Sequence, residues 1–176
     1  TPQLKGKGVS VKLLQHKSQS LKFIVPAELK EGVFGVEMTD VNGVKSYFYL
    51  NAPSVRWVLS EDGEYAMPGN YLRVQGKNLT RDKSKAIAML VPVDGGKNVK
   101  CSVSKFFDDF SVSIDIPENT QPGTYHLYYH NGMGGRTAWS EPLKIEVKSK
   151  NADWWGDAVF NVKDYGAVGD GVHNET

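Results

Sequence analysis

The sequence has little cysteine, no excess of charge of either sign and no long apolar run. Cys101 is the only cysteine, so the chain forms no intrachain disulfide. Lys and Arg number 21 against 20 Asp and Glu, a balance that lacks the clustered positive excess needed to grip nucleic acid or an anionic membrane. No segment approaches the ~20 apolar residues of a membrane-spanning helix. We therefore expect neither a nucleic-acid partner nor membrane insertion.

A faint internal repeat organises what is present. Pro26 and Pro117 are 91 positions apart (117 − 26), as are Gly32 and Gly123 (123 − 32). Alternating apolar residues keep register on both sides of each Pro…Gly turn, which predicts two half-buried strands in each copy. The matched sets are Leu21, Phe23 and Val25 with Val112, Ile114 and Ile116, then Phe34, Val36 and Met38 with Tyr125, Leu127 and Tyr129. Self-similarity at this spacing indicates two copies of one domain.

Upstream of these strands the offset changes to 90 (99 − 9), with Val9, Val11 and Leu13 matching Val99, Cys101 and Val103. A loop that differs by one residue accounts for the change. The first copy, residues 1–51, lacks counterparts of the opening strands, so we expect an incomplete domain and further residues before Thr1.

The second copy, residues 52–149, contains about seven short alternating segments separated by glycine-containing turns. No stretch shows helical periodicity. The pattern predicts an all-β fold built from immunoglobulin-like antiparallel β-sandwich domains, the first one incomplete. Shared inward parity predicts a core made of Trp57, Leu72, Val74, Ile114, Ile116, Tyr125 and Leu127.

One run in this copy, Tyr65 to Leu79, carries a family resemblance. It has a glycine-containing turn, an alternating strand and then a Gly-x-Asn-Leu step, at Gly69, Leu72, Val74, Gly76, Asn78 and Leu79. In this it resembles the IPT/TIG-type immunoglobulin-like domains. The resemblance implies a spacer, a binding module or an interdomain support, and no catalysis.

The composition changes after Lys150. Residues 150–158 read as a linker, and Val159 to Thr176 read VFNVKDYGAVGDGVHNET. This segment resembles the opening of the pectin-lyase-like right-handed parallel β-helix. The resemblance implies an initial strand, a Gly-Asp-Gly turn and a capped helix, as the truncated start of a β-helix domain over residues 159–176. In the turn, Gly166, Gly169 and Gly171 suit positive φ, and Asp170 suits hydrogen bonds to nearby amides. Asn174 or Thr176 suits a helix cap.

The β-helix resemblance implies a parent protein of the polygalacturonase-type glycoside hydrolase or polysaccharide lyase class. This chain would then be its accessory N-terminal region, which supports or targets a catalytic domain and contacts it directly. The catalytic residues would lie beyond Thr176, so we expect no catalytic residue, cofactor or metal here and no activity in the fragment. The partner would be a polysaccharide, and the location secreted, periplasmic or at the cell surface. No signal peptide stands at Thr1, but a mature exported chain has lost its own.

Carbohydrate contacts are the remaining candidate chemistry. His126 and His130 flank Tyr128 on the polar face of one strand, where surface placement and sugar contact are alternatives. A shared metal is excluded, because four residues of strand span ~13 Å while Zn–N bonds are ~2 Å. Trp139 fits either a core edge or an exposed platform. Trp154 and Trp155 fit a sugar platform, or packing at the join.

For the aromatic residues near the join, Trp154, Trp155, Phe160 and Tyr165, we expect buried rings, because a solvated linker is normally polar. Asp108 and Asp109 are neighbouring acids that we expect in a solvated loop rather than in catalysis. The alternative function is a non-enzymatic cell-surface adhesion or glycan-binding immunoglobulin-like module. A phage tailspike would share the β-helix opening.

Overall fold

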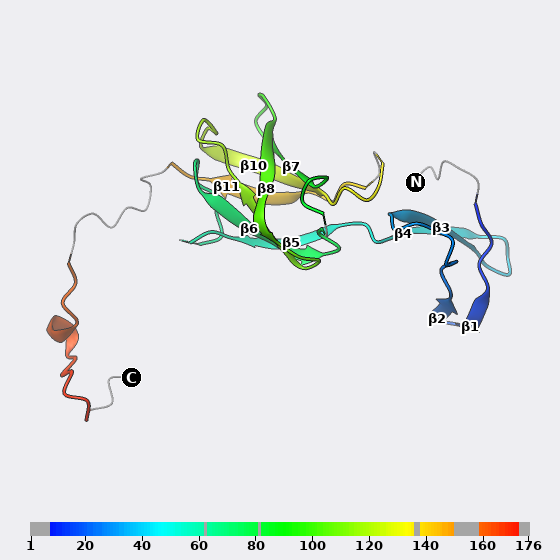
Figure 1. The fold of residues 1–176 in the computed structure, drawn as a ribbon, viewed down its shortest axis with the longest axis horizontal. Coiled ribbons are helices and arrows are strands. Elements are labelled where there is room, and N and C mark those ends of the chain that lie inside the picture. The colour runs from blue at the N-terminus through cyan, green and yellow to red at the C-terminus, as the bar shows by residue number, and fades with distance from the viewer. Residues whose placement is uncertain (1–7, 62, 81, 136–137, 150–158, 173–176) are drawn as a thin grey trace.

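The computed structural model describes residues 8–61, 63–80, 82–135, 138–149 and 159–172, and the fold is all-β (Figure 1). Within these described residues, eleven strands occur in three antiparallel sheets, with one short 3-10 turn near the C-terminal end. No helix in these residues is long and apolar enough to cross a membrane.

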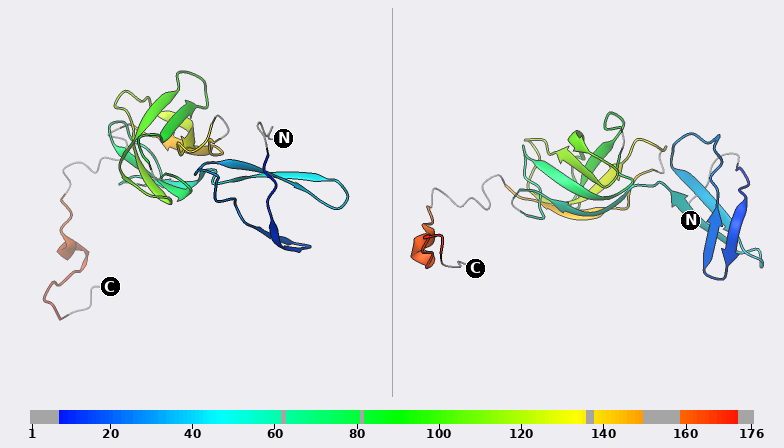
Figure 2. Two further views of the ribbon diagram at one scale, coloured as in Figure 1. Left: turned by 45° about the vertical axis from the view of Figure 1, so that its right-hand side comes forward. Right: turned by 60° about the horizontal axis from the view of Figure 1, so that its bottom comes forward.

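The first unit, residues 8–50, consists of two hairpins (Figure 2). One hairpin pairs β1 (Leu13–Lys17) with β2 (Ser20–Phe23), and the other pairs β3 (Phe34–Thr39) with β4 (Lys45–Leu50). The Asp40 carboxylate closes the β3–β4 turn by accepting hydrogen bonds from the backbone N–H groups of Asn42 and Val44, both at 2.8 Å. Each hairpin is a separate two-stranded sheet.

The central unit is one seven-stranded antiparallel sheet in the order β11-β10-β7-β8-β9-β6-β5. The long strand β8 joins its halves, because Val99–Cys101 pairs with β7 and the segment from Ser102 pairs with β9. Ala66 bridges to Val147, so the outer strands approach each other and the sheet nearly closes into a barrel. The strands are β5 (Ser54–Leu59), β6 (Tyr71–Lys77), β7 (Ile87–Pro92), β8 (Val99–Phe107), β9 (Ser111–Asp115), β10 (Gly123–His130) and β11 (Leu143–Val147).

Most of the predicted core is confirmed. Leu72, Val74, Ile114 and Leu127 are fully buried, and Ile116 and Tyr125 are at most 5% exposed. They belong to one cluster that fills the interior of the central sheet. Their alternation along β6, β9 and β10 is the period of two that places every second side chain on the inner face.

The prediction for Trp57 was wrong, because this side chain is 48% exposed. A register irregularity lies between Val55 and Trp57 where β5 pairs with β6. The extra residue of a bulge shifts the parity of everything after it. Val58 therefore takes the inward position, at 4% exposure, and Trp57 turns outward.

Cys101 lies on the inner face of β8 and is fully buried. Burial, together with the negative charge of Asp115, raises the pKa of the Cys101 thiol to about 12. A thiol needs its thiolate form to react, so Cys101 behaves as a small apolar core residue.

The C-terminal segment forms a 3-10 turn, Val162–Tyr165, where we expected a strand. The Asn161 carboxamide oxygen accepts a hydrogen bond from the Lys163 N–H at 3.1 Å, which caps the start of the turn. Gly166 ends it at φ 94°, and its N–H donates back to the turn carbonyls of Lys163 and Val162. The expected opening strand of a β-helix is therefore absent from residues 159–172, because these local caps close the backbone on itself.

Two local expectations for this segment are confirmed. Gly166, Gly169 and Gly171 have φ of 94°, 65° and 73°. The Asp170 carboxylate accepts a hydrogen bond from the Val172 N–H at 2.9 Å. The expected burial of rings is wrong for Phe160 and Tyr165, which are 57% and 76% exposed. The 3-10 turn that contains Tyr165 buries none of its residues. Trp154, Trp155, Asn174 and Thr176 lie outside the described residues.

Candidate functional site

The outer face of β10 carries three of the predicted sugar-contacting residues. Inward and outward side chains alternate along this strand, so His126, Tyr128 and His130 all face outward and are half-buried. Same-face neighbours on a strand are ~6.6 Å apart at ~3.3 Å per residue. The His126 and Tyr128 rings meet edge to face with centroids 6.5 Å apart.

Trp139 joins this row from the β10–β11 connection. It forms a β-bridge with His130, and their rings are 5.1 Å apart at an interplanar angle of 69°. Trp139 is half-buried, which is intermediate between the core edge and the exposed platform that the sequence left open. The structure thus brings together four of the six predicted residues in what we call the ring row: His126, Tyr128, His130 and Trp139.

Apolar side chains of the neighbouring strand flank the ring row on one side. On the neighbouring strand β7, Val91 pairs with His126, Met89 with Tyr128 and Ile87 with His130, so their side chains share the outer face. All three are half-buried. Exposed lysines stand at the edges, where Lys144 of β11 pairs with His126 and Lys100 of β8 pairs with Met89. The face therefore offers rings, apolar surface and peripheral cations.

His130 is fixed by both of its ring nitrogens. Its Nδ1 accepts a hydrogen bond from the Gly132 N–H at 2.9 Å, and its Nε2 lies 3.1 Å from the Gly135 carbonyl oxygen. A neutral imidazole with its proton on Nε2 satisfies both contacts. His130 thus holds the loop after β10 and gives Trp139 a defined ring to pack against.

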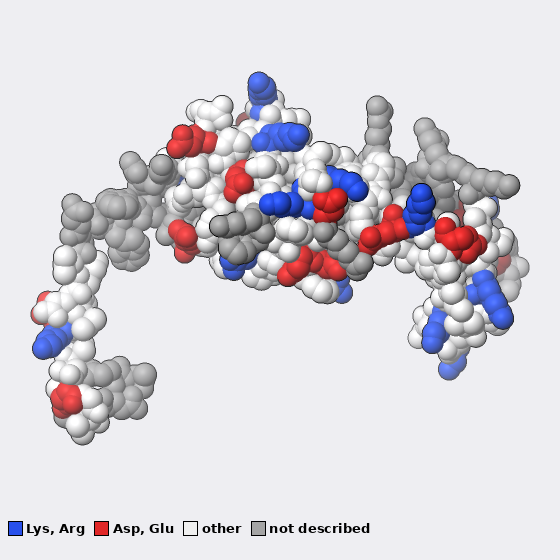
Figure 3. All heavy atoms as spheres, viewed as in Figure 1, with Lys and Arg blue, Asp and Glu red and all other residues white. Residues whose placement is uncertain are grey.

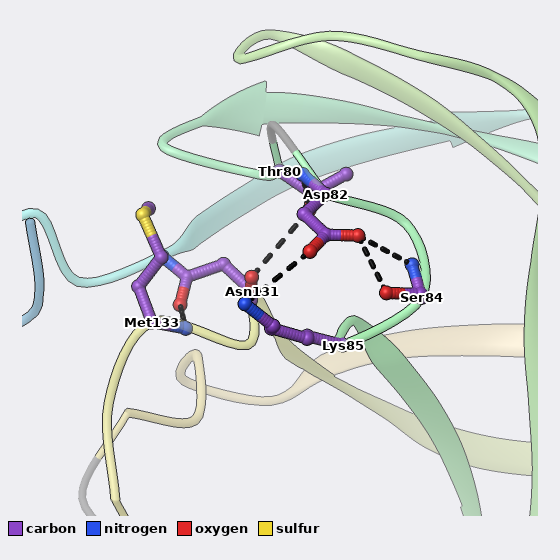
Figure 4. A network of polar contacts seen from close by, with 6 residues as sticks. All are labelled: Thr80, Asp82, Ser84, Lys85, Asn131 and Met133. Carbon is purple, nitrogen blue, oxygen red and sulfur yellow. Dashed lines mark hydrogen bonds and ion pairs between the residues drawn. The ribbon is translucent and has the colours of Figure 1, made fainter.

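Asn131 begins this loop and is almost fully buried, at 1% exposure. Its side-chain amide donates to the carbonyl oxygens of Asn51 at 3.0 Å and Asn78 at 2.9 Å, and its amide oxygen accepts from the Met133 N–H at 3.0 Å. Figure 4 shows this contact with Met133 beside the Thr80 hydroxyl, which donates to the Asn131 carbonyl oxygen at 3.5 Å. Buried polar groups that are satisfied in this way rigidify their surroundings.

The segment Thr80 to Lys85 that approaches Asn131 has its own local support. The Asp82 carboxylate accepts hydrogen bonds from the Ser84 N–H at 3.0 Å and the Ser84 hydroxyl at 2.6 Å, and it lies 3.4 Å from the Lys85 ammonium (Figure 4). The hydrogen bonds with Ser84 are the main cause of a pKa of Asp82 below its ordinary value. This is a surface turn that helps to shape the junction.

The loop that Asn131 begins contacts the first unit, and Asn51 adds a further contact beside it. The Val33 N–H donates to the Met133 carbonyl oxygen at 3.2 Å, and the Asn51 side chain donates to the Gly32 carbonyl oxygen at 3.0 Å. A Cβ on Gly134 would collide with Ala138 and press on the Val33 side chain at 3.0 Å, so the two units approach closely here. Loop 131–140 therefore has the junction at one end and Trp139 at the other.

The acidic pair plays no part in the ring row. The Asp108 carboxylate accepts hydrogen bonds from the N–H groups of Phe110 at 2.7 Å and Ser111 at 2.6 Å, which is a turn-forming role. Among the described residues, no group of three or more His, Cys, Asp and Glu side chains could hold a metal ion. Figure 3 shows basic and acidic side chains interspersed over the visible face, without a large patch of one sign.

Sequence reasoning missed Asn131, Asn78 and Thr80 at the junction. Asn131-Gly132 reads as an ordinary turn signal, and nothing in the residue type distinguishes an exposed turn asparagine from a buried one. The partner carbonyl groups belong to residues 80 and 53 positions away in the chain, so only the tertiary fold identifies them.

No protein-family model matches the sequence, and no curated protein does. Among solved structures, the chain is similar to a putative bacterial DNA-binding protein from Bacteroides vulgatus ATCC 8482, with 14% identity and a TM-score of 0.44 over 68% of this chain and 70% of that one. It is also similar to SGBP-B of the Bacteroides ovatus mixed-linkage glucan utilization locus, solved with a mixed-linkage heptasaccharide. There the identity is 19% and the TM-score 0.38, over 76% of this chain and 34% of that one, so the chain spans about a third of its length.

Proposed function

We propose that this chain is a non-catalytic glycan-binding module of immunoglobulin-like type that acts at the cell surface or after secretion. The observation that carries the proposal is the ring row, in which Tyr128 and Trp139 stand half-exposed with two histidines on one face of the central sheet. The proposal takes residues 52–149 as the binding domain and residues 1–51 as a partial domain of the same type.

The chemistry of the row suits a sugar. Flat aromatic side chains offer a large apolar area with little conformational freedom to lose, and the Tyr hydroxyl adds a polar contact. Half-buried Met89 and Val91 extend the apolar surface beside the rings. Sugar C–H faces can pack on such a surface while their hydroxyl groups reach the imidazoles and the flanking Lys144.

Calorimetric titration of the full chain with neutral β-glucan, xylan and polygalacturonate tests the proposal. We expect one of these polymers to bind, and Trp139→Ala and Tyr128→Ala each to weaken binding about tenfold or more, since buried aromatic anchors dominate binding energies. Trp57→Ala is the control, because Trp57 is an accessible tryptophan, 48% exposed, that lies on β5, away from the row. Binding that Trp57→Ala weakens as much as Trp139→Ala would contradict the assignment of the site.

A second candidate function is the accessory region of a β-helix polysaccharide-degrading enzyme. Its support is the sequence resemblance of residues 159–172, whose three glycines have positive φ, and its opening strand is replaced by a 3-10 turn. The purified chain should release neither reducing ends nor unsaturated uronic products from these polymers. The coding sequence beyond Thr176 decides between the two: repeating coils with clustered Asp support the enzyme, and further immunoglobulin-like repeats contradict it.

A further inference from the structure

The outer face of β10 leads, at its N-terminal end, into a groove between two loops. The groove has a volume of about 490 Å³, in the range of small-molecule sites. The β7–β8 loop, residues 93–98, forms one wall, and the β9–β10 loop, residues 116–122, contributes to the other.

The groove opens at the end of the central sheet and adjoins the ring row. Val99 and Tyr125, which pack on the core side of the sheet, line it together with Thr124 and Lys100 of the outer face. Thr124 lines the groove and lies two residues before His126 on the same face of β10. Lys100 also lines the groove, and it is in register with Met89, which is in register with Tyr128. Residues in register across neighbouring strands project to the same side of a sheet. Thr124 and Lys100 therefore belong to the face that carries the rings.

The groove wall is held in shape by its own hydrogen bonds. The Thr120 side chain is 3% exposed and donates to the Pro117 carbonyl oxygen at 2.7 Å. The Tyr125 hydroxyl donates to the Gln121 carbonyl oxygen at 2.8 Å. The Val93 N–H donates to the Thr124 carbonyl oxygen at 3.0 Å, which ties the facing loop to β10. A site ordered in advance loses less conformational entropy when a ligand binds.

The exposed side chains of the groove suit hydroxyl groups. Asn98 lies on one wall and Asn119 on the other, and both are exposed. A carboxamide carries two donors and one acceptor oxygen, and a sugar hydroxyl is both donor and acceptor. Lys100 adds a cation that suits a hydroxyl or a carboxylate oxygen.

We propose that this groove is a second glycan subsite, continuous with the ring row, so that a linear polysaccharide binds lengthwise along β10. The inference rests on the proposed function and deepens it. From Thr124 to His130 the strand covers about 20 Å at ~3.3 Å per residue, so the surface engages several sugar units at once. The rings hold the sugar faces at one end, and the amides hold hydroxyl groups at the other.

The test is calorimetry of the full chain with cello-oligosaccharides and oligogalacturonates from the disaccharide to the octasaccharide. We expect affinity to rise with length in at least one series. The double variant Asn98→Ala/Asn119→Ala should weaken binding of the longest oligomers about three- to tenfold, the size of one or two lost hydrogen bonds, and leave the shortest unchanged. Asn42→Ala removes a carboxamide from the exposed β3–β4 turn and should change nothing.

The outcomes separate this inference from the proposed function. If Trp139→Ala abolishes binding while the groove variant binds every length normally, the groove is not a subsite and the ring row stands. If the groove variant weakens the shortest oligomers as much as the longest, the lengthwise arrangement is wrong. If neither series nor the parent polymers bind the wild-type chain, both proposals fail.

Discussion

The alternating apolar pattern that the two repeats share is exposed in the first unit and buried in the central sheet. Val112 and Ile116, on and just after β9, are 0% and 2% exposed, whereas their repeat partners Leu21 and Val25, on and just after β2, are 39% and 46% exposed. Hairpin β1–β2 occupies the repeat position of β8–β9, and β3 that of β10. The strands β1, β2 and β3 therefore repeat β8, β9 and β10 in sequence position, but their side chains are not buried in the same way.

Neighbouring strands account for the difference. In the central sheet, β7 lies between β8 and β10 and so joins hairpin β8–β9 to hairpin β10–β11, while β6 pairs with the other side of β9. Together these strands form one sheet with a filled interior. In residues 8–50, β1–β2 and β3–β4 remain separate two-stranded sheets. An isolated hairpin is marginal in water and needs further strands or packing for stability. Alternation thus marks which face of a strand is apolar, and the remaining strands determine whether that face is buried.

Truncation of matched core positions should give the largest contrast. Ile116→Ala removes a side chain from the closed interior and should lower the free energy of unfolding by about 2–5 kcal/mol, through lost burial and a cavity. Val25→Ala, at the matched position, should change it by less than about 0.5 kcal/mol, as exposed substitutions do. Denaturant unfolding of both variants measures this. Equal losses would mean that Val25 is as buried as Ile116 in solution.

The junction between the two regions should respond somewhat less. Asn131→Asp replaces a donor amide by a carboxylate that faces the carbonyl oxygens of Asn51 and Asn78. A buried polar group left unpaired costs about 1–3 kcal/mol, so stability should fall by this amount or more. Hydrogen exchange should quicken at the Val33 amide, whose acceptor is Met133 in the same loop.

Asn42→Asp, in the exposed β3–β4 turn, makes the same chemical change without burial and serves as the control. Unchanged exchange at Val33 in Asn131→Asp would show that the first unit is held to the central sheet by other contacts.

The surface ion pair of the first unit should have the smallest effect. The Lys45 ammonium donates to Glu37 at 2.8 Å across β3–β4, and this contact is the main cause of a lowered pKa of Glu37 and a raised pKa of Lys45. The contribution of Glu37 to stability is present above its ordinary pKa and is lost as pH falls through the lowered value. That of Lys45 is lost as pH rises through its raised pKa.

Both side chains are exposed, so Lys45→Ala should barely change the melting temperature at neutral pH. An NMR titration should show the pKa of Glu37 returning toward its ordinary value in the variant. A large fall in melting temperature would mean that the β3–β4 hairpin depends on this pair, unlike β10–β11, where Leu127 and Leu143 are in register and share the inward face.

Period-two alternation predicted the strands and most of the core, because the inward face of a strand is readable from residue type. It failed at Trp57, where a bulge reversed the parity. The strand that the β-helix resemblance implied near residues 162–165 was also wrong, because side-chain and glycine caps favour a 3-10 turn there. The alternation also placed His126, Tyr128 and His130 on one face. The packing of Trp139 on His130 and the burial of Asn131 depend on contacts between distant segments, which no local pattern encodes.

The buried thiol of Cys101 makes the protein convenient for spectroscopy. Because the only native cysteine is shielded in the core and remains protonated at neutral pH, maleimide dyes or nitroxides should leave it unmodified in the folded chain. A single cysteine introduced at Val41, which is fully exposed in the β3–β4 turn, would then be the one labelled position without removal of the native residue. Paired with a second introduced cysteine on β11, at Lys144, it would report the distance between the first unit and the ring row while a polysaccharide is added.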